Sequence, residues 1–148
     1  MRFHLVGALV GALLLLVPAQ AENVLPSEQF QEVLIKSTLL TFNDANLTGN
    51  YTVLHAKLAK PFRDKFGPDK LKQAFKSFAD KNAEMRGIIL KPPVATTATK
   101  IDERGALVVR GYFDTAPSRV FYELDFLPSE GEWKAINLGV KMKAAGES

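Results

Sequence analysis

The sequence contains no cysteine among its 148 residues. Without a thiol the chain has no disulfide, no thiolate nucleophile, no cysteine ligand for zinc and no cysteine to which a lipid is attached. Histidine is almost as scarce, because only His4 and His55 are present. Zinc sites built from histidine need several of them in one place, so we expect neither a metal nor another cofactor in this protein.

The local signatures of catalysis and of nucleotide binding are also missing. The chain has no phosphate-binding loop, no dinucleotide fingerprint and no pair of carboxylates at a recognisable spacing, and we therefore assign no catalytic residue. The charge is close to balanced, with 19 basic and 16 acidic residues and a net charge of +3. Such a small surplus does not indicate a nucleic-acid partner. The lysine-rich stretch 57–81 is interleaved with aspartates, which is typical of a solvated helical surface.

A long apolar run occurs only once, over residues 5–17. It follows Arg2 and precedes the small residues Ala19 and Ala21, and this order of charge, apolar run and A-x-A site is that of a secretory signal peptide. The run is too short to cross a bilayer as a helix, which takes about 20 residues. We therefore predict a signal peptide over residues 1–21, a single domain over residues 22–148, a periplasmic or secreted location and no stable membrane insertion after cleavage.

Apolar residues recur at three- and four-residue spacing in the first half of the mature chain, and this period predicts three helices. The first covers residues 27–46 and has Ser27 as its N-cap. The second covers residues 50–62 and is expected to break before Pro61, which has no backbone N–H. The third opens at a Gly-Pro pair and has the cleanest amphipathic pattern, over residues 71–79.

The apolar period changes to two in the second half of the chain, which is typical of strands. It predicts four strands, at residues 94–102, 106–114, 119–127 and 132–142. In the third of these, one face carries Val120, Tyr122, Leu124 and Phe126. Short polar connections favour antiparallel pairing. The expected fold class is therefore α+β, with three N-terminal helices that cover the apolar face of a four-stranded antiparallel sheet.

The segment FNDANLTGNYTVLHAKLAKPFRDKF, residues 42–66, combines a helix that ends in N-D-A, a Gly-Asn turn, an aromatic residue at Tyr51 and a second helix that ends near a phenylalanine. With the third helix and a last strand that contains E-W-K-A-I-N, the chain resembles the nuclear transport factor two-like, or cystatin-like, superfamily over residues 27–143. The resemblance implies a cystatin-like cone, in which helices pack on a curved sheet and leave a cavity at the wide end. The Q-x-V-x-G hairpin of the inhibitory cystatins is absent.

Enzymes of this superfamily place Asp, His or Tyr inside the cavity, and our candidates for this cavity are Tyr51, His55, Tyr112 and Tyr122. A histidine suits proton abstraction near neutral pH, although His55 borders the buried side of its helix and has no identifiable catalytic partner. Tyr112 and Tyr122 lie on adjacent predicted strands. A phenol in a cavity can donate a hydrogen bond to a ligand carbonyl, whereas ordinary core packing is the plainer explanation.

Two local patterns in the turn region have simpler explanations than a ligand or a modification. Residues 44–55 match half of a calcium-binding loop, but its last position holds His55 where a glutamate is required, and a helix-turn-helix connection explains the glycine and asparagines better. Asn46 and Asn50 begin N-x-[ST] glycosylation patterns. These patterns have no such meaning in a bacterial protein, the source that the leader and the lack of cysteine suggest.

The face of the sheet that points away from the helices carries Arg110, Glu123 and Asp125, for which cross-strand pairing of opposite charges is expected. Phe121 and Leu127 share this face. If both are exposed, they provide the contact for a homodimer through the sheet.

These patterns favour an exported, non-enzymatic binding module whose cavity or outer sheet face binds a small apolar ligand or a protein of the cell envelope. The alternative is an isomerase- or dehydratase-like enzyme that acts on a small apolar substrate in the cone cavity. That enzyme would use His55 together with Tyr112 or Tyr122. The alternative therefore predicts that these side chains surround one enclosed cavity.

Overall fold

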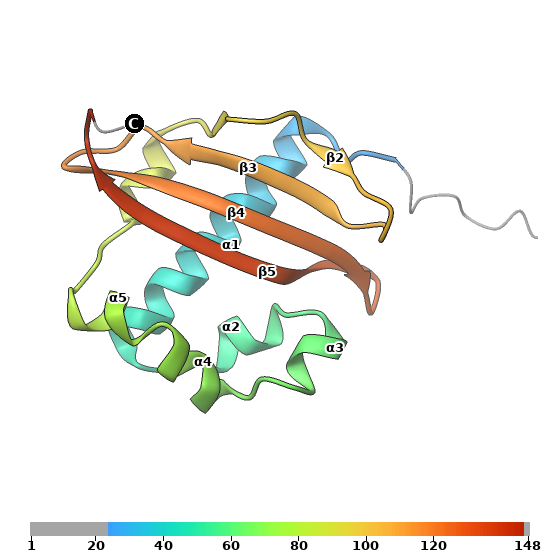
Figure 1. Cartoon of the computed structure of the whole chain (residues 1–148), viewed down its shortest axis with the longest axis horizontal. Helices are drawn as coiled ribbons and strands as arrows, with labels where there is room; N and C mark the ends of the chain where they lie inside the picture. The colour runs from blue at the N-terminus through green and yellow to red at the C-terminus, as the bar shows by residue number, and fades with distance from the viewer. Residues whose placement is uncertain (1–23, 147–148) are drawn as a thin grey trace, which may run out of the picture.

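The structure, a computed structural model, describes residues 24–146, and the predicted signal peptide lies outside the described residues. Helices come first along the chain: α1 (Glu28–Thr48), α2 (Thr52–Ala56), α3 (Lys60–Arg63), α4 (Pro68–Ala74), α5 (Lys76–Asp80) and the 3-10 helix η2 (Arg86–Leu90). The strands follow: β1 (Val94–Ala95), β2 (Lys100–Ile101), β3 (Leu107–Phe113), β4 (Ser118–Ser129) and β5 (Glu132–Ala144). This part of the chain is an α+β fold with an open five-stranded antiparallel sheet (Figure 1).

Helix α1 confirms the first predicted helix, and both of its ends are capped. The Ser27 hydroxyl accepts a hydrogen bond from the Phe30 N–H at 3.2 Å, which satisfies one of the backbone donors that a helix leaves free at its N-terminus. At the other end Gly49 adopts a left-handed conformation with a φ of 72°, and its N–H donates to the Ala45 carbonyl. A glycine takes this conformation without strain, and it therefore ends the helix.

The second predicted helix is interrupted earlier than the pattern predicts. The pattern places the break at Pro61, but α2 ends before it because the next residues leave the helix and pair with the sheet. The Ala59 N–H donates to the Ala135 carbonyl at 2.9 Å, and the Ala135 N–H donates to the Lys57 carbonyl at 3.0 Å. Pro61 then lies in the first turn of α3, where a missing N–H leaves no helical hydrogen bond unmade.

The third predicted helix forms as two short helices, so residues 24–146 contain five α-helices and the prediction of three is wrong. The helical path breaks at Phe75, whose φ of −105° and ψ of 14° lie outside helical values. The rings of Phe75 and Phe78 both pack edge-on against the buried Phe42, with centroid distances of 4.8 Å and 5.1 Å. This aromatic packing accompanies the departure from the regular helical period.

The sheet has the order β1-β3-β4-β5, and β2 also pairs with β3. Strands β3, β4 and β5 confirm three of the four predicted strands. The strand predicted over residues 94–102 forms instead as two strands of two residues each, so the sheet has five strands where four were expected. Residues 96–98 between them are exposed, and they bury no side chain that would hold this segment along the whole of β3.

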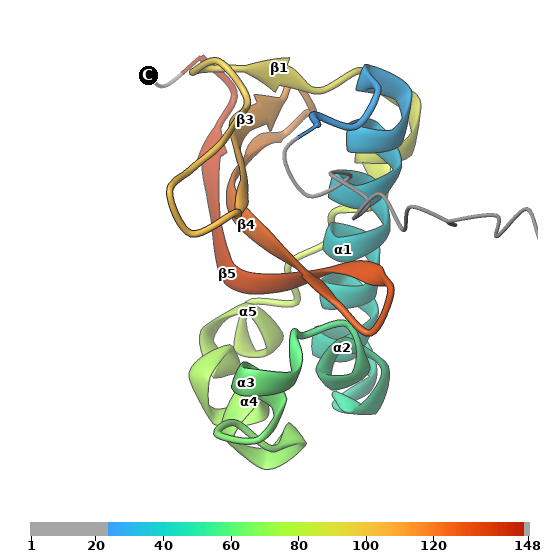
Figure 2. The ribbon, with the colours of Figure 1, turned by 90° about the vertical axis from the view of Figure 1, so that its right-hand side faces the viewer.

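The inner face of the sheet carries the core, as the alternation predicts. Val120, Tyr122, Leu124 and Phe126 of β4 are each at most 3% exposed. Figure 2 shows that the sheet curves and that α1 runs along its inner face. The start of α1 lies near β1, whereas α2–α5 gather at the opposite end of the molecule (Figures 1 and 2).

The outer face of the sheet carries the expected pairing of opposite charges. The Asp125 side chain is buried, and its carboxylate accepts from Arg110 at 2.7 Å and from Arg104 at 3.0 Å. Arg104 also pairs with Asp102 at 2.7 Å, and its hydrogen bond lowers the pKa of Asp102. One carboxylate shared by two guanidinium groups thus ties the turn before β3 to the middle of β4.

A buried amide of α1 holds the residues that lead into η2. Asn43 of α1 is fully buried, and its Oδ1 accepts from the Met85 N–H at 3.0 Å. Its Nδ2 donates to Glu84 Oε1 at 2.9 Å. Both ends of this side chain are therefore used to hold the segment that leads from the helices to the sheet.

Replacing Asn43 by alanine should destabilise the fold by about 1–3 kcal/mol, because the buried Met85 N–H loses its acceptor. The free energy of unfolding, measured by urea denaturation, reports the loss. The neighbouring Asp44 is exposed, so Asp44→Ala is the matched control and should stay within about 0.5 kcal/mol of the parent. Equal urea midpoints for the two variants would contradict the role given to Asn43.

Candidate functional site

The four residues expected in one cavity lie in three separate places. Tyr51 and His55 belong to the turn and helix after α1, Tyr112 lies on the outer face of β3, and Tyr122 lies on the inner face of β4. Among residues 24–146, His55 does not line any of the main clefts. The arrangement that the enzyme alternative requires, His55 beside a tyrosine in one cavity, does not occur in these clefts.

Tyr51 contacts the end of α1. It is buried, its hydroxyl donates to Asn46 Oδ1, and burial raises its pKa. Asn46 Nδ2 is buried as well and has no hydrogen-bond partner among the described residues. The amide is therefore held through its oxygen alone, and the Tyr51 hydroxyl supplies one contact between the start of α2 and the end of α1.

His55 contacts the chain that follows α2. Its Nε2 lies 3.1 Å from the Arg63 carbonyl oxygen, so this nitrogen carries the proton and donates it in a hydrogen bond. The Arg63 guanidinium in turn donates to the Leu58 carbonyl at 2.9 Å and pairs with Glu130. These contacts give His55 a part in positioning α3 against the β4–β5 turn.

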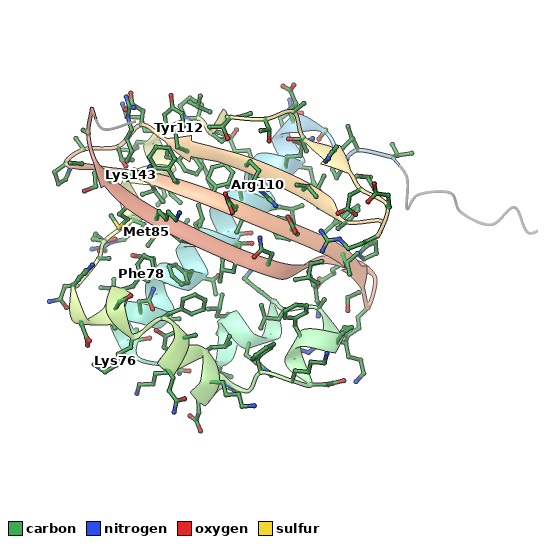
Figure 3. The ribbon with its side chains drawn as sticks, viewed as in Figure 1. Lys76, Phe78, Met85, Arg110, Tyr112 and Lys143 are labelled. Carbon is green, nitrogen blue, oxygen red and sulfur yellow. The ribbon has the colours of Figure 1, made fainter. Side chains whose placement is uncertain are left out.

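Tyr112 belongs to a group of aromatic rings and cations on the outer face (Figure 3). Its ring lies 5.3 Å from that of Phe121, and the Arg119 guanidinium lies 5.2 Å from its centroid. The ammonium group of Lys143 lies 4.9 Å from the Phe121 ring. Both rings are half-buried among these side chains, and a homodimer through this face stays a prediction.

The Tyr122 side chain lies on the inner face of the sheet and is 3% exposed. Its hydroxyl makes no hydrogen bond with any described residue, but it is not fully enclosed, because within residues 24–146 the only buried side-chain polar atom without a partner is Asn46 Nδ2. Burial raises the pKa of Tyr122 to about 12. The hydroxyl lies over Gly111, where a Cβ would come within 2.5 Å of it and closer still to the Val94 carbonyl oxygen. Glycine at this position is what gives the tyrosine ring its space.

Tyr122 lines a cleft of about 880 Å³, which we call the Tyr122 cleft. One wall is the first part of α1, with Glu28, Glu32 and Ile35, and the other is the edge of the sheet around β1 and β3. Val109 and Tyr122 contribute the inner face of the sheet. The Glu32 carboxylate pairs with Lys36 at 2.6 Å, whereas Glu28 forms no ion pair within residues 24–146. The helix side of the cleft is thus acidic, and the sheet side combines apolar residues with Thr99, Arg110 and Tyr122.

A second cleft, of about 480 Å³, lies between α1, α2 and the β4–β5 hairpin, and we call it the Trp133 cleft. Its walls are largely apolar and include Phe30, Leu34 and Trp133, with Lys57 and Lys134 beside them. The Trp133 cleft is the smaller of the two and has no phenol, so the Tyr122 cleft is the better candidate.

Gly111 is the part of the site that the sequence analysis did not single out. It stands in the middle of the apolar alternation of β3, and a glycine inside a strand often marks a close approach of another group. That signal was present in the sequence. The contribution of α1 had no comparable signal, because Glu28 and Glu32 look like ordinary solvated residues of a first helical turn.

Two tyrosine-to-phenylalanine variants separate structural from functional hydroxyls. Tyr51→Phe should destabilise the fold by about 1–3 kcal/mol, because it leaves the Asn46 amide buried without its remaining bond. Tyr122→Phe removes a hydroxyl that has no partner among the described residues, so its unfolding free energy should stay within about 0.5 kcal/mol of the parent. Urea denaturation of both variants tests the pair, and a large loss in Tyr122→Phe would mean that this hydroxyl serves the fold.

Among residues 24–146, no group of three or more His, Asp or Glu side chains is placed to hold a metal ion. In the same part of the chain no helix combines the length and the apolar character needed to cross a membrane. The chain matches no protein family, no curated protein and no solved structure. A function for this protein is therefore inferred from its own residues.

Proposed function

We propose that this protein is an exported, non-enzymatic binding module that holds a small, largely apolar molecule in the Tyr122 cleft. The observation that carries the proposal is the Tyr122 hydroxyl, which lines the cleft and has no hydrogen-bond partner among the described residues. This hydroxyl is free to donate to a ligand, and a hydrogen bond of this kind contributes about 0.5–1.5 kcal/mol.

The surroundings of Tyr122 define the chemistry of the ligand. With a pKa raised to about 12, the phenol stays protonated at neutral pH and acts as a donor. Ile35 and Val109 offer apolar contact, and the lining carries charges of both signs, with Glu28 and Glu32 on α1 and Arg110 on β3. The ligand that fits is a neutral molecule with an apolar body and a carbonyl or similar oxygen.

The proposal includes the family resemblance and the location. We infer membership of the nuclear transport factor two-like superfamily and a cystatin-like cone whose wide end is the Tyr122 cleft. The curved sheet with α1 along its inner face supports this arrangement (Figure 2). We also infer that residues 1–21 are removed as a signal peptide and that the domain acts in the periplasm or outside the cell. The binding function is preferred to isomerase or dehydratase activity because the His55 ring is engaged with Arg63, away from the cleft.

Native mass spectrometry of the protein purified from its own envelope or medium should reveal a retained small molecule. Two exposed alanines give a matched pair of variants, since Ala95 lines the Tyr122 cleft and Ala56 lines the Trp133 cleft. Ala95→Trp should abolish retention by filling the site, and Ala56→Trp should leave it unchanged. Tyr122→Phe should lower the affinity about tenfold, the value of one hydrogen bond.

The same experiment has clear contrary outcomes. Retention that survives Ala95→Trp but is lost in Ala56→Trp would move the ligand to the Trp133 cleft. Equal affinity in Tyr122→Phe and the parent would remove the hydroxyl from recognition. The absence of a bound molecule from the parent protein and from all three variants would count against the binding function.

A further inference from the structure

Basic residues are concentrated in one part of the fold. Residues 52–81, which contain α2–α5, include eight lysines and arginines against three aspartates, a surplus of five positive charges. The rest of the described chain has ten basic and eleven acidic residues. The positive charge of the protein thus belongs to this helical segment and not to the sheet or α1.

This segment forms a face of its own. Figures 1 and 2 both place α2–α5 together at one end of the molecule, beyond the β5 edge of the sheet. In Figure 3 Lys76 of α5 points away from the sheet at this end. The Tyr122 cleft lies at the other end, where α1 begins near β1. The basic face is therefore separate from the candidate ligand site.

Most lysines of this basic face are not neutralised by the protein. Lys65, Lys70, Lys72 and Lys81 are exposed, and none of them forms an ion pair within residues 24–146. The exposed pairs that do form, such as Lys76 with Asp80, join residues one helical turn apart. Pairs of this kind are weak in water. The charge of the basic face is thus available to an external anion.

Apolar side chains are exposed within the same segment. Phe66 is 41% exposed and Val53 is 63% exposed. The Phe66 ring stacks on that of Phe62, with centroids 5.8 Å apart, which holds it at the surface. A segment that combines exposed apolar residues with several lysines has both features that favour binding at the boundary between lipid headgroups and acyl chains.

We propose that the basic face formed by α2–α5 docks on the surface of a membrane that contains anionic lipids. Headgroup phosphates would attract the lysines, and Phe66 and Val53 would enter the boundary layer. Each lysine close to an anionic leaflet strengthens binding about fivefold. An acidic protein or a nucleic acid would use the same charge, but the two exposed apolar side chains complement lipid better than either of these partners.

Co-sedimentation with vesicles tests the proposal. The protein used is the mature form, after the cell has processed it. Vesicles of phosphatidylcholine with about 30 mol% phosphatidylglycerol should bind the protein, and pure phosphatidylcholine should not. Raising the salt from about 0.1 M to about 0.5 M should weaken binding at least tenfold, because the charges are exposed and screened. Phe66→Ser should weaken binding several-fold while the salt dependence stays the same.

Two triple variants of equal net charge locate the docking face. Lys65→Glu, Lys70→Glu and Lys72→Glu together should lower vesicle binding at least tenfold. The control replaces Lys91, Lys100 and Lys141 by glutamate. These lysines are exposed, lie outside α2–α5 and form no ion pair within residues 24–146. The control variant should bind vesicles like the parent. Circular dichroism melting of both variants checks that they fold.

Three results would overturn the proposal. Equal losses in the two triple variants would mean that only total charge matters. Failure of the folded parent to bind anionic vesicles would exclude lipid as the partner. Binding to polyglutamate or to single-stranded DNA without binding to vesicles would assign the basic face to an acidic macromolecule instead.

Discussion

The packing of α1 against the inner face of the curved sheet is the contact on which the other parts of the fold depend. Leu39 and Phe42 of α1 are fully buried there, and Phe42 also receives the rings of Phe75 and Phe78 from the α4–α5 region. Each buried side chain of this size contributes about 1.5–3 kcal/mol by leaving water. Because the chain has no cysteine, no disulfide adds to the stability that this apolar contact provides.

The elements with a strong local signal were predictable, and those decided by distant contacts were not. The caps and apolar period of α1 and the alternation of β4 are local properties, and both elements appear where they were expected. The end of α2 depends on a pairing with Ala135, far along the chain. The break at Phe75 accompanies contacts of its ring and that of Phe78 with Phe42. A single-sequence pattern carries no information on such long-range partners.

The candidate site was likewise predictable only where the signal is local in the sequence. The alternation of β4 was enough to place Tyr122 on the inner face, but it did not show that Gly111 leaves room for the hydroxyl end of the ring. It also did not show that the start of α1 closes the cleft. The other candidates are Tyr51, His55 and Tyr112. Their residue types can line a cavity, but the fold places them in different surroundings. Whether such a residue can act in a site depends on where the fold places it, and the residue type alone does not give that position.

The two-residue strands β1 and β2 bear on how separate molecules of this protein meet. A long, regular strand at the border of a sheet exposes a row of backbone groups on which another chain can add, and such borders promote aggregation. Here one border consists of β1 and β2, which are too brief to template an incoming strand, and the other is occupied at Ala135 by the linker before α3. Lys141 and Lys143 add charge farther along that second border. Each border of the sheet therefore carries a feature that disfavours the addition of a strand from another molecule.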